Sequence, residues 1–315
     1  MTDCPTSGLT VVKPGMLTLL QDLGRFGYQH LGLTPGGAAD EQAFLWANRL
    51  LDNSPNSAAL EITLGGLELR VEKAIRIALT GADLQASCNG VALANWQTHN
   101  VKAGDRLQFG FPRSGVRAYL AVPGGFVVAP VFGSVATVVR EQMGGLDGRG
   151  RPLQEGDRLP CTSCEARMSR RVPPRFIPDY AEPLTVRVME GQQRALFDAA
   201  QMNRFYASEY RVSTQSDRMG VRLDGPGLHP TEGGIVSEGI PFGAIQVPPS
   251  GQPIILLKDR QTIGGYPKLG TVHPLDAFAL AQRQPGQLIR FELASAEEVN
   301  DYRVFLRFMH ETSRR

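Results

Sequence analysis

The sequence has few cysteines, no long apolar run and no concentration of positive charge. Four cysteines in 315 residues are too few for a disulfide framework and favour a reducing compartment, so we expect a cytoplasmic protein. The most apolar stretch, residues 118–132, is broken by prolines and glycines and is too short to span a bilayer. The 33 basic and 31 acidic residues are scattered, unlike the basic stripe of a nucleic-acid-binding protein. We therefore expect neither a nucleic-acid nor a membrane partner.

Several motifs that carry well-understood chemistry are also missing. The sequence has no G-x-x-x-x-G-K-[ST] phosphate loop, no G-x-G-x-x-G after a predicted strand and no G-x-S-x-G nucleophile turn. Cys161 and Cys164 form a lone C-x-x-C pair and the five histidines are isolated, so we expect no bound metal. Because there is no Met-Lys-Met sequence, we also expect no covalently attached biotin.

Turn-forming residues are abundant and lie between short apolar runs. The 35 glycines and 22 prolines separate runs rich in β-branched residues, which predicts a mainly β protein with a few helices. We expect strands at residues 9–12, 60–64, 67–71, 75–79, 106–109, 116–122, 184–189, 254–257 and 287–293.

Three predicted helices interrupt this pattern. Asp40 can cap the first, whose apolar side chains recur at helical spacing until Asn53. The second is shorter and begins near Pro274. Ser295 and Glu298 form an S-x-x-E capping box ahead of the third, the terminal helix. We expect all three helices to pack against sheets.

A faint internal duplication and a proline-rich connector predict two domains. SGVRAYLAVPGGF in the first half and SGQPIILLKDRQTIGGYPK in the second both read as a turn, an apolar strand and a double glycine. Residues 162–183 combine prolines with arginines and have no apolar period, as in a connector between domains. We expect one β-barrel-like lobe at residues 1–170 and another, with the terminal helix, at residues 171–315.

One polar segment follows a buried strand. In residues 243–268, the strand predicted at 254–257 leads directly into Lys258, Asp259 and Arg260. Glycines just beyond would let backbone N–H groups approach a ligand, which favours a binding loop. A plain turn with a solvated charge cluster is the alternative.

Two further segments place polar side chains beside glycines and prolines. In residues 213–226, the guanidinium of Arg218 could hold a carboxylate or phosphate through two parallel hydrogen bonds. The alternative is an ordinary surface ion pair. Residues 14–40 contain a glycine-bearing corner that could be catalytic or architectural, with the polar side chains Gln21, Asp22 and Arg25.

These segments resemble the biotin-dependent carboxyltransferase-like family, which includes the C component of 5-oxoprolinase, allophanate hydrolase subunit 2 and the carboxyltransferase domain of urea carboxylase. The matching stretches include PGMLTLLQDLGRFGYQHLGL, GGAADEQAFLWANRLLDN, VSTQSDRMGVRLDGP and GAIQVPPSGQPIILLKDRQTIGGYPK. Together with shorter matches they extend over residues 9–291, so the resemblance covers nearly the whole chain.

The resemblance implies two cyclophilin-like β-barrel lobes and a heteromeric enzyme. The implied activity is that of an ATP-dependent 5-oxoprolinase, which opens the 5-oxoproline lactam to L-glutamate. Its implied partners are the B component of 5-oxoprolinase, in a direct complex, and the A component, with ATP shared among all three proteins. Two alternatives stay open: a protein of the carboxyltransferase or allophanate-hydrolase type that acts on urea-like amides, and a non-catalytic antagonist of a sporulation-kinase inhibitor.

The resemblance also implies roles for individual residues. Arg218 would hold the substrate carboxylate or a phosphoryl group, with Asp217 orienting it. Lys268 would stabilise negative charge on the lactam oxygen, and Asp259 would position substrate or transfer a proton. The implied substrate-binding residues are Gln215, Asp217, Gln246, Gln261, Thr262, Gly264, Gly265 and Tyr266, and a second candidate site comprises Gln21, Asp22 and Arg25.

The sequence departs from the family pattern at several positions. Many members have serine where Gly37 stands and threonine where Ile263 stands. Because Ile263 lies beside the implied site and lacks a hydroxyl, the fine substrate specificity stays open. A further change, at Leu51 and Asp52, lies at the end of a predicted helix, where we expect it to alter only packing.

Overall fold

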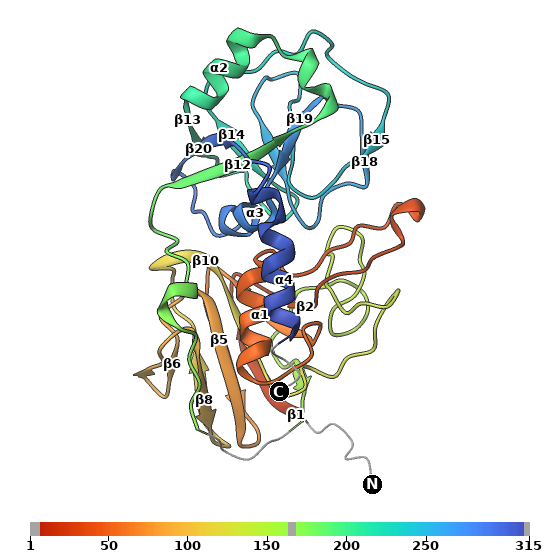
Figure 1. Ribbon diagram of the computed structural model, residues 1–315. Helices are drawn as coiled ribbons and strands as arrows, with labels where there is room; N and C mark the ends of the chain where they lie inside the picture. Colours follow the sequence, from red (N-terminus) through yellow and green to blue (C-terminus); the bar gives the residue numbers. More distant parts are fainter. Residues whose placement is uncertain (1–6, 163–167, 312–315) are drawn as a thin grey trace. The chain divides into compact units, whose positions relative to one another are not determined.

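The computed structural model describes residues 7–162 and 168–311, which fall into two compact units (Figure 1). Neither unit is one continuous stretch of sequence. The main boundary follows Tyr180, later than the division at residues 170 and 171 that we expected. In addition, Phe26–Pro35 belongs to the second unit and Phe308–Arg315 to the first. Unit 1 consists of Met1–Arg25, Gly36–Tyr180 and Phe308–Arg315, and unit 2 of Phe26–Pro35 and Ala181–Arg307.

The boundary lies later than expected because the end of the proline-rich connector packs on unit 1. The N–H of Val172 donates to the carbonyl of Trp96 at 2.9 Å. The hydroxyl of Tyr180, a buried side chain, donates to the Asp40 carboxylate at 2.7 Å. Residues 168–180 are therefore anchored on unit 1 at Val172 and Tyr180, while most of their other side chains are exposed.

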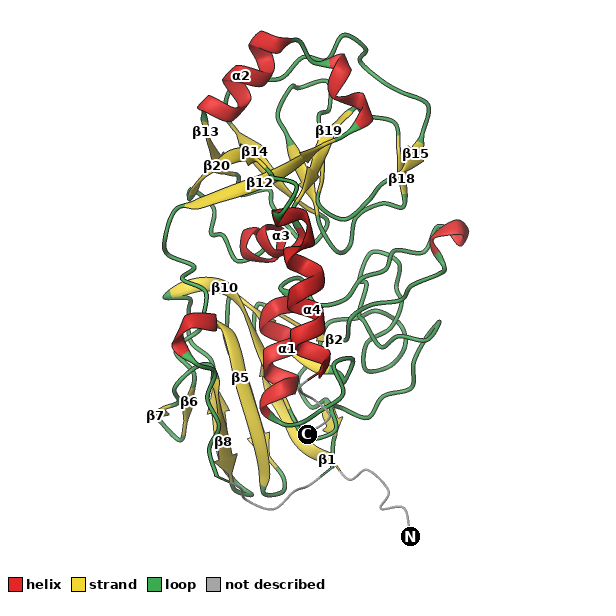
Figure 2. Ribbon diagram, in the orientation of Figure 1, coloured by secondary structure: helices red, strands yellow, loops and turns green. Residues whose placement is uncertain are grey.

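Strands dominate both units, which confirms the prediction of a mainly β protein (Figure 2). Unit 1 contains two antiparallel sheets. The order in the six-stranded sheet is β11 (Arg158–Pro160), β1 (Ser7–Pro14), β4 (Leu67–Val71), β9 (Arg106–Gln108), β6 (Ser87–Cys88) and β7 (Val91–Ala92). The order in the five-stranded sheet is β2 (Leu17–Gln21), β3 (Ala59–Thr63), β10 (Ser114–Ala121), β5 (Ile75–Asp83) and β8 (Gln97–Val101).

One apolar cluster from both sheets forms the core of unit 1, with side chains such as Leu9, Leu60, Leu69 and Ile77 fully or almost fully buried. The helix α1 (Glu41–Leu50) packs on the five-stranded sheet through β5 and β10. Its predicted cap is confirmed, because Asp40 Oδ1 accepts the N–H of Ala43 at 3.0 Å. A short 3-10 helix, η2 (Pro174–Phe176), also belongs to unit 1.

Unit 2 contains a closed barrel of seven strands. Their order is β12 (Leu184–Glu190), β19 (Lys268–Val272), β16 (Ala244–Gln246), β17 (Ile254–Leu256), β14 (Gly220–Asp224), β13 (Glu209–Val212) and β20 (Leu288–Leu293). The ring closes because β20 pairs with β12 in parallel, from Leu184 opposite Ile289 onward. A separate two-stranded ribbon joins β15 (Glu238–Gly239) to β18 (Ile263–Gly264).

The helices of unit 2 include two that the sequence predicts. The predicted start near Pro274 is confirmed by α3 (Pro274–Leu280). The predicted capping box is also confirmed: the N–H of Ser295 donates to Oε2 of Glu298 at 2.8 Å, and the N–H of Glu298 donates to Oγ of Ser295 at 3.3 Å. The third predicted helix is α4 (Asp301–Glu311), which passes from unit 2 to unit 1 after Arg307. The remaining helices are α2 (Ala199–Ala207) and the 3-10 helices η1 (Gln29–Leu31), η3 (Gln192–Leu196) and η4 (Glu298–Asn300). Within the described ranges, no helix is long and apolar enough to cross a membrane.

A glycine in the barrel wall gives a direct test of its packing. A Cβ at Gly270, in β19, would lie 2.4 Å from the carbonyl oxygen of Met189 in the neighbouring β12. We expect Gly270→Ala to lower the free energy of unfolding by about 1–3 kcal/mol in urea denaturation, the usual cost of overpacking. Gly239→Ala is the matched control, because a Cβ there meets no atom within 4 Å. Similar losses for the two variants would contradict this account of the barrel wall.

Candidate functional site

Three consecutive charged residues follow β17, and all three are buried. Lys258, Asp259 and Arg260 expose only 7%, 9% and 6% of their surface. The structure therefore excludes the alternative of a solvated charge cluster. Buried charges must be paired or hydrogen-bonded, so the partners of each side chain define what this segment can do.

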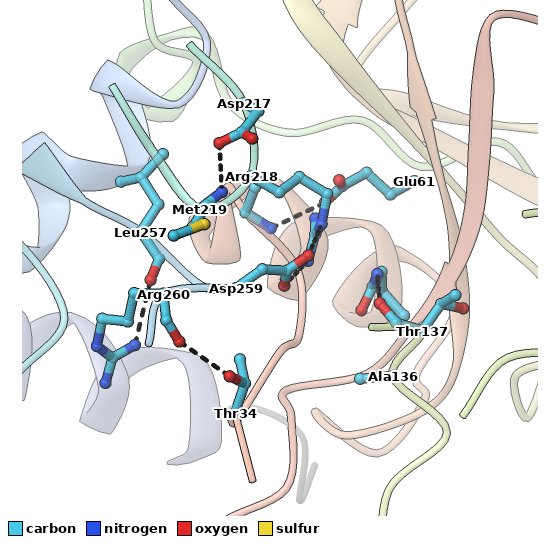
Figure 3. A network of polar contacts seen from close by, with 12 residues as sticks. Thr34, Glu61, Ala136, Thr137, Asp217, Arg218, Met219, Leu257, Asp259 and Arg260 are labelled. Carbon is cyan, nitrogen blue, oxygen red and sulfur yellow. Dashed lines mark hydrogen bonds and ion pairs between the residues drawn. The ribbon is translucent and has the colours of Figure 1, made fainter. Parts of the chain in front are cut away.

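Asp259 is paired with Arg218, and the pair joins the two loops that the sequence analysis singles out (Figure 3). Nε and Nη2 of Arg218 donate to the two carboxylate oxygens of Asp259, each at 2.9 Å. Backbone hydrogen bonds run beside this bidentate pair, from the N–H of Asp259 to the carbonyl of Arg218 and from the N–H of Leu257 to that of Met219. The pair therefore extends the contact between β14 and β17 beyond the ends of both strands.

Asp217, which was expected to orient Arg218, instead stabilises its own turn. Its Oδ1 accepts the N–H of Met219 at 2.8 Å (Figure 3). The same oxygen accepts the N–H of Gly220 at 3.1 Å. The side chain is exposed, as is that of nearby Gln215. The geometry thus gives the orienting role to Asp259.

Lys258 and Arg260 are stabilised by aromatic rings and carbonyl groups. The ammonium of Lys258 lies 5.0 Å from the ring centre of Phe242 and 5.6 Å from that of Phe278. Arg260 donates from Nε to the carbonyl of Ile240 at 2.9 Å. Burial away from water lowers the pKa of Arg260 to about 10, which still leaves the guanidinium charged at neutral pH.

Lys268 is the first residue of β19 and lies near the other end of β17, with β16 between the two strands. It faces Gln246 in the β16–β19 ladder, and Gln246 in turn faces Ile254, the first residue of β17. Asp259 lies beyond the other end of β17, past Leu257. The extended residues 254–257 span roughly 10 Å at about 3.3 Å per residue. The structure therefore brings Arg218 and Asp259 together and places Lys268 and Gln246 apart from them.

Lys268 borders a cavity of about 220 Å³ in unit 2. Its ammonium lies 2.6 Å from Oε1 of Glu238, with the lysine side chain 11% exposed and the glutamate side chain 49% exposed. Gln193 holds both partners, because its Nε2 donates to Glu238 at 2.6 Å and its Oε1 accepts the backbone N–H of Lys268 at 2.8 Å. The hydrogen bond from Lys268 is the main cause that lowers the pKa of Glu238 below its usual value. The remaining lining comes from Gly191, Gln192, Gly239, Pro241, Gly270 and Thr271.

The implied substrate-binding segment after Gln261 forms an edge ribbon. The N–H of Ile240 donates to the carbonyl of Thr262 at 3.0 Å. Gly264 is required by close approach, because a Cβ there would lie 2.6 Å from Ile240 Cδ1 and 3.0 Å from Gln246 Nε2. The carbonyl of Gly265 accepts the N–H of Ile235 at 2.8 Å. Gln261 and Tyr266 are exposed at this ribbon, while Gln246 is buried.

The second candidate site is a buried, hydrogen-bonded corner of unit 1. Asp22 accepts the N–H of Gly24 and the hydroxyl of Ser134 on Oδ1, at 2.8 and 2.6 Å. Its Oδ2 accepts the N–H of Val135 at 2.9 Å. Gln21 and Arg25 donate to the carbonyls of Thr137 and Ala136, at 3.1 and 2.7 Å. These bonds fasten the chain after β2 to residues 134–137, an architectural arrangement.

Sequence reasoning missed Glu238 and Gln193, which complete the Lys268 site. Neither belongs to a recognisable motif, and each comes from a segment far from Lys268 in sequence. Among the described residues, no group of three or more histidine, cysteine or acidic side chains could hold a metal ion. Cys164, the second cysteine of the C-x-x-C pair, lies outside those residues.

Comparison with known proteins identifies the family. The family model described as carboxyltransferase domain, subdomain A and B, matches residues 31–293. This chain belongs to that family. It is 40% identical to the C component of 5-oxoprolinase from Escherichia coli (strain K12), over 92% of both chains. It is 36% identical to the protein of the same name from Haemophilus influenzae, over 89% of both. The family predicted from the sequence is thereby confirmed.

Solved structures support the same conclusion. The crystal structure of TTHA0988 matches 93% of this chain with a TM-score of 0.83 and 34% identity, and this chain spans 57% of that one. The urea carboxylase of Kluyveromyces lactis matches 99% of this chain with a TM-score of 0.89 and 27% identity, and this chain spans 29% of that protein. The fold is therefore shared with larger proteins of which it forms one part.

The buried Arg218–Asp259 pair gives a stability prediction. Asp259→Ala leaves the guanidinium without this carboxylate in a site from which water is largely excluded. We expect a loss of about 3–5 kcal/mol in the free energy of unfolding, measured by urea denaturation. Arg222→Ala removes an exposed arginine of the neighbouring β14 and should change it by no more than about 0.5 kcal/mol. A loss below about 1 kcal/mol for Asp259→Ala would mean that the pair does not hold the two loops together.

Proposed function

We propose that this chain is one component of a heteromeric, ATP-dependent 5-oxoprolinase that opens the lactam of 5-oxoproline to give L-glutamate. The observation that carries the proposal is the 40% identity to the C component of E. coli 5-oxoprolinase over 92% of both lengths. By contrast, the urea amidolyase of Saccharomyces cerevisiae is 31% identical, and the match covers only 17% of that protein. The nearly full-length match favours a separate 5-oxoprolinase component over a carboxyltransferase acting on urea-like amides.

The chemistry of the proposed reaction needs more than one polypeptide. A lactam carbonyl is a poor electrophile because its nitrogen donates electron density, so hydrolysis is coupled to ATP, which is converted to ADP and phosphate. Water supplies the atoms that are added when the C–N bond breaks. Because this sequence has no phosphate loop, we assign no ATP-binding residue to this chain and propose that ATP acts in the complex with the A and B components.

Within this chain, the Lys268 cavity is the better candidate for contact with the substrate. Asp259 already occupies two nitrogens of the Arg218 guanidinium, so that group acts as a structural tie between loops. Lys268 presents a charge at a cavity whose volume is below the roughly 300–1,000 Å³ of pockets for drug-sized ligands, which suits a small substrate. We propose that its ammonium stabilises negative charge on the bound substrate.

The proposal predicts activity only in the assembled complex. Co-expressed with the A and B components, the chain should support ATP-dependent release of glutamate from 5-oxoproline. Lys268→Ala should reduce kcat/KM by about 100-fold or more, because removing one partner of a buried charge pair costs about 2–5 kcal/mol of binding. Lys102→Ala, an exposed lysine of unit 1, should leave turnover unchanged. Absence of glutamate release by a correctly assembled wild-type complex would refute the proposed function.

A further inference from the structure

The ion pair between Lys268 and Glu238 is unequal, because the cation is buried and the anion is not. The lysine side chain is 11% exposed and the glutamate side chain 49% exposed. The lysine is also the more firmly held of the two. It begins β19, faces Gln246 in the barrel wall and donates its backbone N–H to Gln193.

A buried ammonium requires an anion close to it. Removing the counter-ion from a buried charge is strongly destabilising, because the low-dielectric surroundings replace little of the lost hydration. The requirement is for negative charge at that position and not for a particular residue. Any carboxylate that reaches the same place, with an amide donor beside it, satisfies Lys268 as well as Glu238 does.

Glu238 has the features of an anion that can leave. It lies on the two-residue strand β15, which pairs with the equally short β18, outside the barrel. The next residue, Gly239, has open space where a side chain would project. Its carboxylate is half exposed, so water can solvate it once it moves away. Its pKa is lowered chiefly by Lys268, so it is ionised at neutral pH and competes as an anion.

We propose that Lys268 and Gln193 form a binding site for the carboxylate of a small ligand, and that Glu238 occupies this site until the ligand replaces it. The choice of 5-oxoproline as the ligand rests on the proposed function. The cavity adjoins the ammonium, and the backbone of Gly191 and Gly270 forms part of its wall. On this assignment Lys268 contacts the substrate carboxylate. The family resemblance had implied a contact with the lactam oxygen instead.

If the ligand carboxylate replaces Glu238, the two anions compete for Lys268. Neutralising Glu238 should therefore strengthen ligand binding. In isothermal titration calorimetry on the full chain, we expect Glu238→Gln to bind 5-oxo-L-proline about tenfold more tightly than wild type. Glu292→Gln, which neutralises an exposed glutamate on β20 of the same unit, should bind like wild type. The neutral lactam 2-pyrrolidinone, which lacks the carboxylate, should not respond to Glu238→Gln.

A double-mutant cycle separates exchange from an indirect effect. Lys268→Met should weaken binding of 5-oxo-L-proline, and Glu238→Gln should no longer strengthen binding in the Lys268→Met background. Unchanged or weaker binding by Glu238→Gln would overturn the inference. So would an absence of detectable binding by both wild type and Glu238→Gln.

Turnover by the assembled complex distinguishes this inference from the proposed function. If the complex releases glutamate but Glu238→Gln does not bind 5-oxoproline more tightly, the function stands and the exchange site fails. If Glu238→Gln tightens binding but the correctly assembled complex releases no glutamate, the carboxylate site stands and the proposed function fails.

Discussion

The bidentate pair between Arg218 and Asp259 is the interaction on which the charged end of the barrel depends. Both side chains are buried, so each requires the other. Because Asp259 is fixed, the residues on either side of it are directed to different partners. Lys258 lies over two aromatic rings, and Arg260 donates to backbone carbonyls. Three adjacent ionisable residues are thereby buried without forming one exposed cluster.

Arg218 and Lys268 show why arginine and lysine suit different tasks. The planar guanidinium of Arg218 matches both oxygens of one carboxylate, which makes it a good structural tie and a poor site for exchange. The ammonium of Lys268 is a point charge with no preferred plane, so it can accept one carboxylate in place of another. Arg218, which was predicted to hold a substrate anion, is thus paired with Asp259 of this chain, while Lys268 faces a cavity.

The sequence predicts where the helices and strands lie along the chain better than it predicts which of them lie side by side in the fold. Helix caps such as Asp40 and the Ser295–Glu298 box are local, and the structure confirms both. The predicted strands are found, but short ones such as β16 and the helix α2 were not identified, since a few residues carry little periodic signal. The separation of Lys268 from Asp259 depends on strand register, which the short loop between them does not reveal. Glu238 could not be found because it reaches Lys268 through the pairing of β15 with β18, which the sequence does not reveal.

The parallel pairing of β12 with β20 has a consequence for how unit 2 forms during synthesis. Leu184 pairs with Ile289, so about a hundred residues separate the partners that close the ring. Contacts this distant in sequence form slowly, because a long loop must be closed first. While the chain is still on the ribosome, the other six strands can assemble only into an open sheet with two unprotected edges. The ring is completed once the last strand has emerged, so a chain truncated before residue 288 would lack the strand that closes it.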